Sequence, residues 1–264
     1  MSLLSIFGKH RSLVFELTRR EVLGRYRGAS FGLLWSLISP FLMLLVYTLA
    51  FGFIMKSRWP GTSGSTTSFA LVLFAGLTTH GFFAECLTRA PQLIVGNASY
   101  VKRVVFPLEV LGWSMVFSAT FHLCMNIVVL LLMQWFWGGG LHVTSFLLPI
   151  VLLPLLILNV GIAWILSALG VFLRDIGQIA GVIAAAALFL SSAIIPIEAV
   201  PASYRIVFEL NPLTLIINQV REVVIWGRVP DWSALGIYSL IAVAVAVVGH
   251  ALFQKLRKGF ADVL

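Results

Sequence analysis

The chain has 264 residues, of which 60% are hydrophobic and 11% charged, and its mean hydropathy is +1.02. Soluble domains carry about 25% charged residues, so the composition excludes an ordinary soluble domain and predicts an all-α polytopic membrane protein. The formal net charge is +8, but the basic residues lie between apolar runs, where topology and anionic lipid explain them better than nucleic acid.

The first predicted element is an amphipathic helix over residues 6–20, followed by a linker to residue 30. Its apolar residues fall on one helical face and its charged residues on the other. The pattern is typical of a helix in the membrane interface, and it also fits a helix packed on a neighbouring domain. The apolar face comprises Ile6, Phe7, Leu13, Val14 and Leu17.

Six apolar runs are long enough, at about 20 residues, to cross a hydrocarbon core. We place six transmembrane helices near residues 31–55, 69–87, 110–137, 146–173, 176–195 and 232–253. In the fifth run, Gly177 and Gly181 form a GxxxG pair that predicts a close helix contact. Together with the tail 254–264, these elements make one membrane domain over residues 1–264.

The distribution of basic residues predicts the orientation of these helices. With the N-terminus in the cytoplasm, thirteen of the 18 Lys and Arg residues face the cytoplasm and five face the other side. The positive-inside rule therefore predicts that both termini and the loop 88–109 are cytoplasmic.

Loop 88–109 is a basic interruption between the second and third runs. Glu85 lies one helical turn before Arg89 at the start of this loop, so the two side chains are expected to pair. A proton-relay role for Glu85 is the alternative.

Polar side chains recur every four residues in the third run. Such a stripe either lines a channel for a hydroxyl-rich substrate or forms hydrogen bonds between helices. Its members are Ser114, Ser118, His122 and Asn126. Trp113 and Trp164, within or near spans, could stack on sugar rings or pack against lipid and helices.

Segment 198–231 is apolar but interrupted by charged residues, among them Arg221 and Glu222. A charge at mid-bilayer costs about 2.5–3.5 kcal/mol on insertion scales, so full spanning is not expected. Asn211 followed by Pro212 is typical of a helix start, and this helix is predicted to end near Trp226. We therefore predict two short re-entrant helices between the fifth and sixth spans.

The chain contains no GxxxxGK[ST] phosphate-binding motif and no pair of intramembrane carboxylates typical of an ion-coupled pump. We therefore expect that it is not an enzyme, holds no cofactor or metal, and takes its energy from another protein.

Four blocks of sequence occur in order along the chain: TRREVLGRYRGASFGLLW before the first span, NASYVKRVVFPLEVLGW in loop 88–109, RDI after the fourth span, and NPLTLIINQVREVVIWGRVPDW before the sixth. Together they resemble the ABC-2 type permeases that export polysaccharides, including the transmembrane subunits of O-antigen exporters.

The resemblance implies a homodimer in the bacterial inner membrane, bound to two copies of a separate ABC ATPase that holds ATP and Mg²⁺. Its substrate would be O-antigen polysaccharide linked to undecaprenyl pyrophosphate. Loop 88–109 would contain a coupling helix over residues 91–101 and segment 198–231 a periplasmic gate. The coupling residues would be Pro91, Asn97, Ser99, Tyr100 and Val101, and the gate residues Asn211, Pro212, Arg221, Glu222 and Trp226.

A pyrophosphate carrier needs cations near its entry. The candidates are Arg25, Arg27, Arg89, Lys102 and Arg103, although retention of their segments in the cytoplasm explains them equally well. Two other functions stay open: an ABC-2 exporter of another lipid or a drug, and a membrane enzyme that acts on polyprenyl lipids.

Overall fold

The computed structural model describes residues 3–54, 59, 66–102 and 106–264, and this part of the chain contains helices, turns and loops but no β-strand. The expected all-α polytopic membrane fold is thereby confirmed. Arg103 and the side chains of Ile6 and Phe7 lie outside the described residues. The main helices are α1 (Leu3–Arg25), α2 (Trp35–Tyr47), α3 (Thr66–Arg89), α5 (Glu109–Trp137), α6 (Leu148–Phe172), α7 (Ile176–Phe189), α8 (Arg205–Leu210), α9 (Pro212–Val224) and α10 (Trp232–Leu256).

Five of the described helical segments are long and apolar enough to cross a membrane, where the sequence predicted six. They are Gly32–Phe51, Phe69–Gln92, Glu109–Trp137, Val143–Phe172 and Trp232–Val263. The fifth predicted span, α7, has only 14 residues, about 21 Å at 1.5 Å per residue, which is short of a hydrocarbon core of about 30 Å. It ends because the Asn211 amide donates hydrogen bonds to the carbonyls of Ala187 and Leu190, at 3.0 and 3.1 Å.

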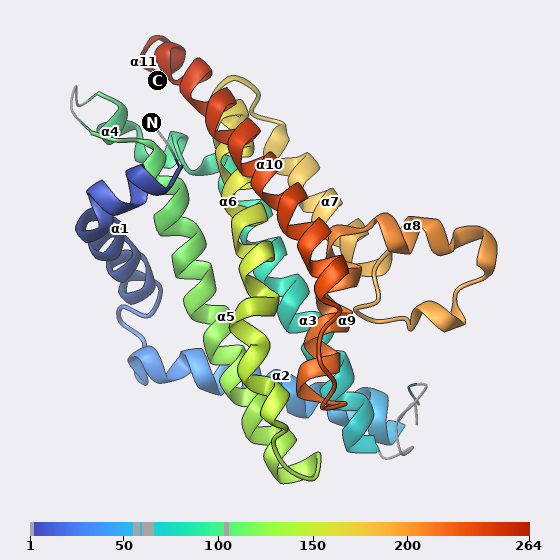
Figure 1. The fold of residues 1–264 in the computed structure, drawn as a ribbon. Coiled ribbons are helices and arrows are strands. Elements are labelled where there is room, and N and C mark those ends of the chain that lie inside the picture. The colour runs from blue at the N-terminus through green and yellow to red at the C-terminus, as the bar shows by residue number, and fades with distance from the viewer. Residues whose placement is uncertain (1–2, 55–58, 60–65, 103–105) are drawn as a thin grey trace.

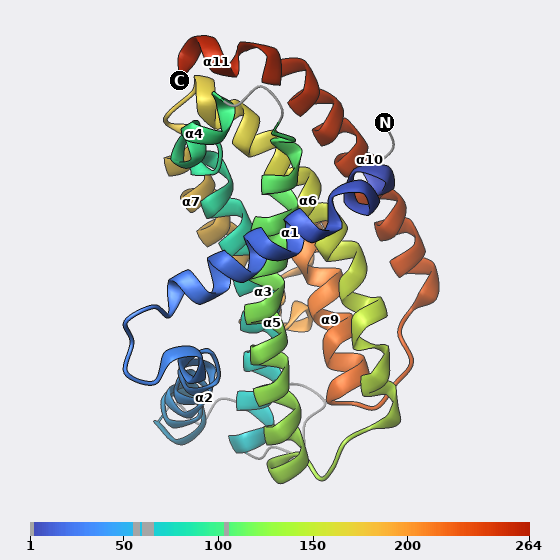
Figure 2. The ribbon, with the colours of Figure 1, turned by 90° about the vertical axis from the view of Figure 1, so that its left-hand side faces the viewer.

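Helices α3, α5, α6 and α10 run along the length of the molecule (Figures 1 and 2). The two chain ends, the short helix α4 (Ala98–Val101) and the turn between α6 and α7 gather at one end of it in both views. The charge distribution assigns these same segments to one side of the membrane. Their position at one end of the fold therefore agrees with the predicted relative orientation of the helices.

The first predicted span has a different direction from the others. Helix α2 lies crosswise to α3 and α5, side-on in Figure 1 and end-on in Figure 2. It continues as the π-helix η2 (Thr48–Ile54). Gly28 and Gly32, at φ +85° and +48°, turn the chain between α1 and α2, in a region of φ that favours glycine. An apolar helix thus forms where it was expected, but it is not parallel to the other spans.

Helix α1 packs on the rest of the chain through the predicted apolar face. Val14 and Leu17 are buried and join the core that α5 also contributes to, whereas Glu16 and Arg19 on the other side are exposed. The Thr18 hydroxyl donates to the Ser114 carbonyl of α5 at 3.4 Å. The amphipathic pattern is therefore explained by packing within this chain, and Figure 2 shows α1 lying obliquely across α5.

The closest helix pair is α6 with α10. A Cβ atom added to Gly161 would lie 2.7 Å from the backbone nitrogen of Ala246, and one added to Gly249 would collide with the Gly161 carbonyl. The close helix contact predicted at the GxxxG pair of α7 is not observed at Gly181 within the chain, because a Cβ atom on Gly181 would meet open space. Glycines on two different helices, not one motif, allow the close approach.

Two helices, α8 and α9, fill the segment between α7 and α10. Asn211 caps α9, since its side-chain oxygen accepts from the Leu213 amide at 2.9 Å, and Pro212 is the first helical residue. The predicted helix start is thus confirmed. Glu222 lies 3.8 Å from Arg228, and Trp226 packs beside the buried cluster around Trp59.

The C-terminal residues fold back on the molecule instead of extending as a tail. Phe260, in α11 (Phe260–Val263), is fully buried with its ring centre 6.0 Å from that of Phe172. Arg257 pairs with Glu109 at 2.9 Å and donates to the Phe106 carbonyl at 3.1 Å. This contact holds the point where loop 88–109 rejoins α5.

Candidate functional site

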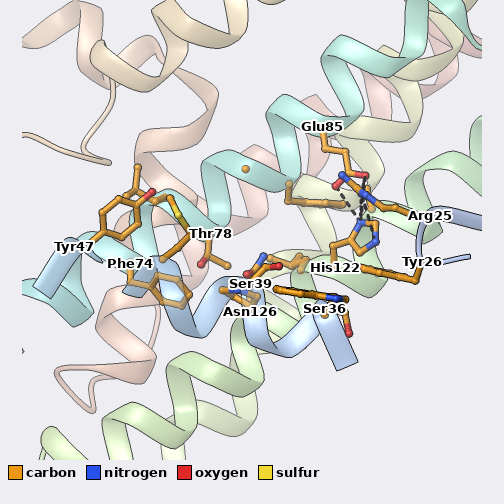
Figure 3. Close-up of a pocket in the computed structure, with 18 residues that line it drawn as sticks. Arg25, Tyr26, Ser36, Ser39, Tyr47, Phe74, Thr78, Glu85, His122 and Asn126 are labelled. Atoms are coloured by element: carbon orange, nitrogen blue, oxygen red, sulfur yellow. Dashed lines mark hydrogen bonds and ion pairs between the residues drawn. The ribbon is translucent and has the colours of Figure 1, made fainter. Parts of the chain in front are cut away.

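A cavity of about 390 Å³ lies between the end of α1 and helices α2, α3 and α5 (Figure 3). We call it the α2–α3 pocket. The crosswise direction of α2 creates it, because residues along the whole of α2, from Trp35 to Tyr47, face the middle of α3 and α5 across the cavity. Its polar and aromatic lining residues are Arg25, Tyr26, Trp35, Ser36, Ser39, Tyr47, Phe74, Thr78, Phe82, Glu85, His122 and Asn126.

The middle of the α2–α3 pocket is rich in hydroxyl and amide groups. Ser36 and Ser39 come from α2, Thr78 from α3 and Asn126 from α5. The Ser36 hydroxyl donates to the Leu33 carbonyl at 2.7 Å. The Thr78 hydroxyl is buried and has no hydrogen-bond partner among the described residues. An unpaired buried hydroxyl is costly, so this part of the pocket is suited to a ligand that carries hydroxyl groups.

Arg25, Glu85 and His122, at one end of the pocket, belong to a group of charged side chains that we call the ion-pair cluster: Glu21, Arg25, Glu85, Arg89 and His122. Glu85 is its centre, with Arg25 at 2.7 Å, Arg89 at 3.0 Å and His122 at 3.1 Å. Arg89 also pairs with Glu21 at 2.7 Å. The predicted pairing of Glu85 with Arg89 is confirmed, and the structure adds α1 and α5 to it.

The cluster is balanced in charge. Arg25 and Arg89 supply two positive charges, and Glu21 and Glu85 supply two negative ones. His122 adds a charge only when it is protonated. Both arginines are thus neutralised by carboxylates within hydrogen-bond distance, and the pocket has no surplus positive charge while His122 is neutral.

The predicted polar stripe of the third span divides into two pairs. His122 and Asn126 line the α2–α3 pocket, whereas Ser114 and Ser118 are buried and do not. The Ser114 hydroxyl donates back to the Leu111 carbonyl at 3.0 Å. The stripe drifts around the helix because a spacing of four exceeds the 3.6 residues of one turn, so its two ends face different neighbours.

The two predicted tryptophans lie in the core of the chain. Trp164 is fully buried and donates to the Glu109 carbonyl at 3.0 Å. Trp113 is half-buried, with its ring stacked on Phe117 and edge-on to Trp164. Neither lines the α2–α3 pocket, so in this structure both serve helix packing.

In its described residues, loop 88–109 forms three short helical turns in place of one coupling helix: η3 (Ala90–Gln92), η4 (Val95–Asn97) and α4. Of its five expected coupling residues, Ser99 is exposed and Asn97, Tyr100 and Val101 are half-buried. Pro91 is buried against α6, because a Cβ atom on Gly170 would collide with the Pro91 carbonyl. Pro91 therefore cannot meet a partner protein in this structure.

The loop is tied to α1 by an aromatic residue. Arg20 donates to the Tyr100 hydroxyl at 2.6 Å, and the Tyr100 ring stacks on Phe106 with 4.4 Å between ring centres. The next residue of α1, Glu21, belongs to the ion-pair cluster. Loop 88–109 is thereby connected through α1 to the α2–α3 pocket.

The four expected entry cations that lie in the described part of the chain do not form one site. Arg25 lines the pocket, Arg89 pairs with Glu21 and Glu85 beside it, and Arg27 and Lys102 are exposed elsewhere. Of the expected gate residues, Arg221 is fully buried and donates to the carbonyls of Val72, Ser192 and Ala193 at 2.7–3.0 Å.

Sequence reasoning missed the contribution of α2 to the pocket. Ser36, Ser39 and Tyr47 lie in a run that reads as a simple apolar span. The spacing of three between the serines was a signal of one polar face, but the crosswise packing of α2 follows from tertiary contacts that no local pattern records.

Comparison with known proteins assigns the class. The model of the ABC-2 type transporter family matches residues 12–225, which is most of the chain, and the chain belongs to this family. It is therefore an integral membrane protein of a transporter family, as its apolar helices require.

Individual relatives match almost the whole length. The chain is 26% identical over 262 residues to the O-antigen export system permease protein RfbA of Klebsiella pneumoniae, covering 96% of this chain and 95% of that protein. It is 24% identical over 256 residues to the RfbA protein of Myxococcus xanthus, covering 96% of both. It is also 24% identical over 250 residues to the polysialic acid transport protein KpsM of Escherichia coli, covering 94% of this chain and 95% of that protein.

Proposed function

We propose that this chain is the channel-forming subunit of an ATP-driven exporter that moves a lipid-linked polysaccharide of the O-antigen type out of the bacterial cytoplasm. The observation that carries the proposal is the similarity over 96% of the chain to permeases named for O-antigen export. The lack of a phosphate-binding motif in the sequence agrees with an ATPase on a separate chain.

The subunit sits in the inner membrane with both termini in the cytoplasm. The gathering of the chain ends and loop 88–109 at one end of the molecule supports this orientation (Figure 1), because thirteen of the 18 basic residues belong to that side. Helices α8 and α9 then form the re-entrant gate on the periplasmic side.

Two subunits pair to enclose the channel, and two ATPase copies bind at loop 88–109. Ser99, which is exposed at the end of the molecule, is the centre of this docking surface. The Arg20–Tyr100 hydrogen bond connects the docking surface with α1. A displacement of the loop by the ATPase would therefore move α1 and the ion-pair cluster that α1 shares with α3 and α5.

The docking surface is tested by copurification of the partner ATPase with a tagged chain. Ser99→Arg places a long charged side chain at the docking surface and is expected to reduce copurification at least tenfold. Ser203→Arg is the matched control, because Ser203 is also exposed but lies in the segment before α8, and it should retain the ATPase. Equal retention by both variants would contradict docking at this loop.

The alternative within the family is an exporter of another lipid or a drug. Stimulation of the reconstituted ATPase by a drug, without stimulation by a lipid-linked polysaccharide, would support that alternative. A membrane enzyme is the second alternative, and turnover of a polyprenyl lipid by the chain without any ATPase would support it.

A further inference from the structure

We propose that the α2–α3 pocket is a binding site for an uncharged saccharide unit of the exported chain, and that it does not hold the carrier pyrophosphate. This inference rests on the proposed function and deepens it, since it locates a sugar site inside one subunit and states the charge of its ligand.

The first argument is the unpaired hydroxyl in the pocket wall. Thr78 is 6% exposed, lines the cavity, and its Oγ1 has no partner among the described residues. Most buried polar side-chain atoms in proteins are hydrogen-bonded, and each exception requires an explanation. A hydroxyl group of a sugar can both donate to and accept from Thr78, and it would supply the missing partner.

The second argument is the arrangement of the remaining wall. In Figure 3, Ser39 and Asn126 lie close to Thr78 on neighbouring helices, so hydroxyl and amide groups meet from three sides. Trp35 and Tyr26 add aromatic rings to the same wall. Ligand sites typically combine an apolar or aromatic lining with a few placed polar groups, and a sugar ring presents both apolar C–H faces and hydroxyl edges.

Size limits what the pocket can hold. Its volume of about 390 Å³ is at the lower end of the range of small-molecule pockets, about 300–1,000 Å³. The pocket therefore accommodates one or a few sugar rings and not a long stretch of polysaccharide.

The charges of the ion-pair cluster disfavour the binding of an anionic ligand. Arg25, which lines the pocket, is bound to Glu85 at 2.7 Å, and Arg89 is bound to both Glu85 and Glu21. A pyrophosphate or a sugar carboxylate at Arg25 would share the guanidinium group with Glu85 and would lie beside a like charge. Such juxtaposed charges oppose binding, whereas a neutral hydroxyl group can bind without breaking these pairs.

The test is a binding titration of the full chain in lipid nanodiscs with two probes of equal length, neutral mannotriose and the trimer of sialic acid. We expect mannotriose to bind at least tenfold more tightly than the acidic trimer. Thr78→Val removes the unpaired hydroxyl with little change in shape and should weaken mannotriose binding about three- to tenfold, the value of one neutral hydrogen bond.

Thr79→Val is the matched control. Thr79 follows Thr78 in α3, but its hydroxyl donates to the Ala75 carbonyl and it does not line the pocket, so binding of mannotriose should change less than twofold. If Thr78→Val lowers the melting temperature, Ser39→Ala replaces it, since Ser39 is an exposed lining residue. Tighter binding of the acidic trimer, no binding of mannotriose, or equal effects of the two valine variants would overturn the proposal.

Failure of the proposed saccharide site can be distinguished by experiment from failure of the proposed exporter function. Binding is measured on this chain alone, and Thr78→Val should copurify its ATPase as wild type does. Loss of sugar binding with retained ATPase association would overturn only the saccharide site. Sugar binding by a chain that associates with no ATPase would overturn only the exporter.

Discussion

Arg221 shows how a charged residue can be enclosed by a membrane protein. Its guanidinium group donates to three backbone carbonyls on α3 and the segment after α7, and it lies 4.3 Å from the centre of the Trp59 ring. Hydrogen bonds to a charged group contribute about 1.5–3 kcal/mol each, and the ring adds a cation–π contact. Arg221 thereby fastens α9 to the rest of the chain.

The site of Arg221 requires a glycine on α3, and this gives a residue-scale prediction. A Cβ atom on Gly76 would lie 2.6 Å from an Arg221 nitrogen and 2.7 Å from the Ala193 carbonyl oxygen. Gly76→Ala is expected to destabilise the protein by about 1–3 kcal/mol through overpacking, observed as a lower melting temperature in detergent.

Gly81→Ala is the control for that measurement, because a Cβ atom on Gly81 of the same helix meets open space. Its effect should be neutral or stabilising, by up to about 1 kcal/mol from helix propensity. A loss of stability that is the same for both variants would show that the close contact of Gly76 with Arg221 and Ala193 does not cause the loss.

At the residue scale, the sequence predicted local features well and distant partners poorly. The Asn211–Pro212 helix start and the Glu85–Arg89 pair are confirmed because both depend on residues fewer than five positions apart. The three carbonyl partners of Arg221 lie 28 to 149 positions away, and no local pattern indicates them.

The ion-pair cluster is the main polar link among α1, α3 and α5. Glu85 on α3 contacts Arg25 of α1 and His122 of α5, and Arg89 contacts Glu21 of α1. Because α1 also donates to Tyr100 in loop 88–109, this helix connects the proposed docking surface with the α2–α3 pocket. The position of α1 should therefore depend on the charge of Glu85.

Glu85→Gln tests that dependence. It removes the carboxylate shared by Arg25, Arg89 and His122 and is expected to destabilise the protein by about 1–3 kcal/mol, because partly buried cations lose a charged partner. Trypsin should then cleave faster after the exposed residues Arg25 and Arg27.

Glu16→Gln removes the same charge from an exposed position on α1 that makes no ion pair among the described residues. It should leave both the melting temperature and the rate of cleavage near those of wild type. Wild-type behaviour of Glu85→Gln would instead mean that apolar contacts alone hold α1 on α5.

At the element scale, apolar length predicted most helices but neither their direction nor their breaks. The runs at 69–87, 110–137 and 232–253 correspond closely to α3, α5 and α10. The short α7 and the crosswise α2 differ from expectation because Asn211 caps the first and tertiary packing directs the second. Hydropathy records the amount of apolar surface and not what covers it.

At the scale of the whole molecule, loop 88–109 and both termini gather at one end, the turn between α5 and α6 forms the other end, and α8 projects to one side (Figure 1). The ion-pair cluster and the α2–α3 pocket lie between the two ends, on helices that contact loop 88–109. This arrangement suits a subunit that receives movement at one end and passes a hydrophilic chain through the membrane, which is the central claim of the proposed function.

That claim is tested most directly with inside-out membrane vesicles that contain the chain, its partner ATPase and a labelled polysaccharide on a polyprenyl pyrophosphate. Transport into the vesicle lumen would protect the label from a glycosidase added outside. We predict protection that requires ATP and is lost in Ser99→Arg. Protection without the ATPase, or no protection with ATP and both proteins present, would contradict the account.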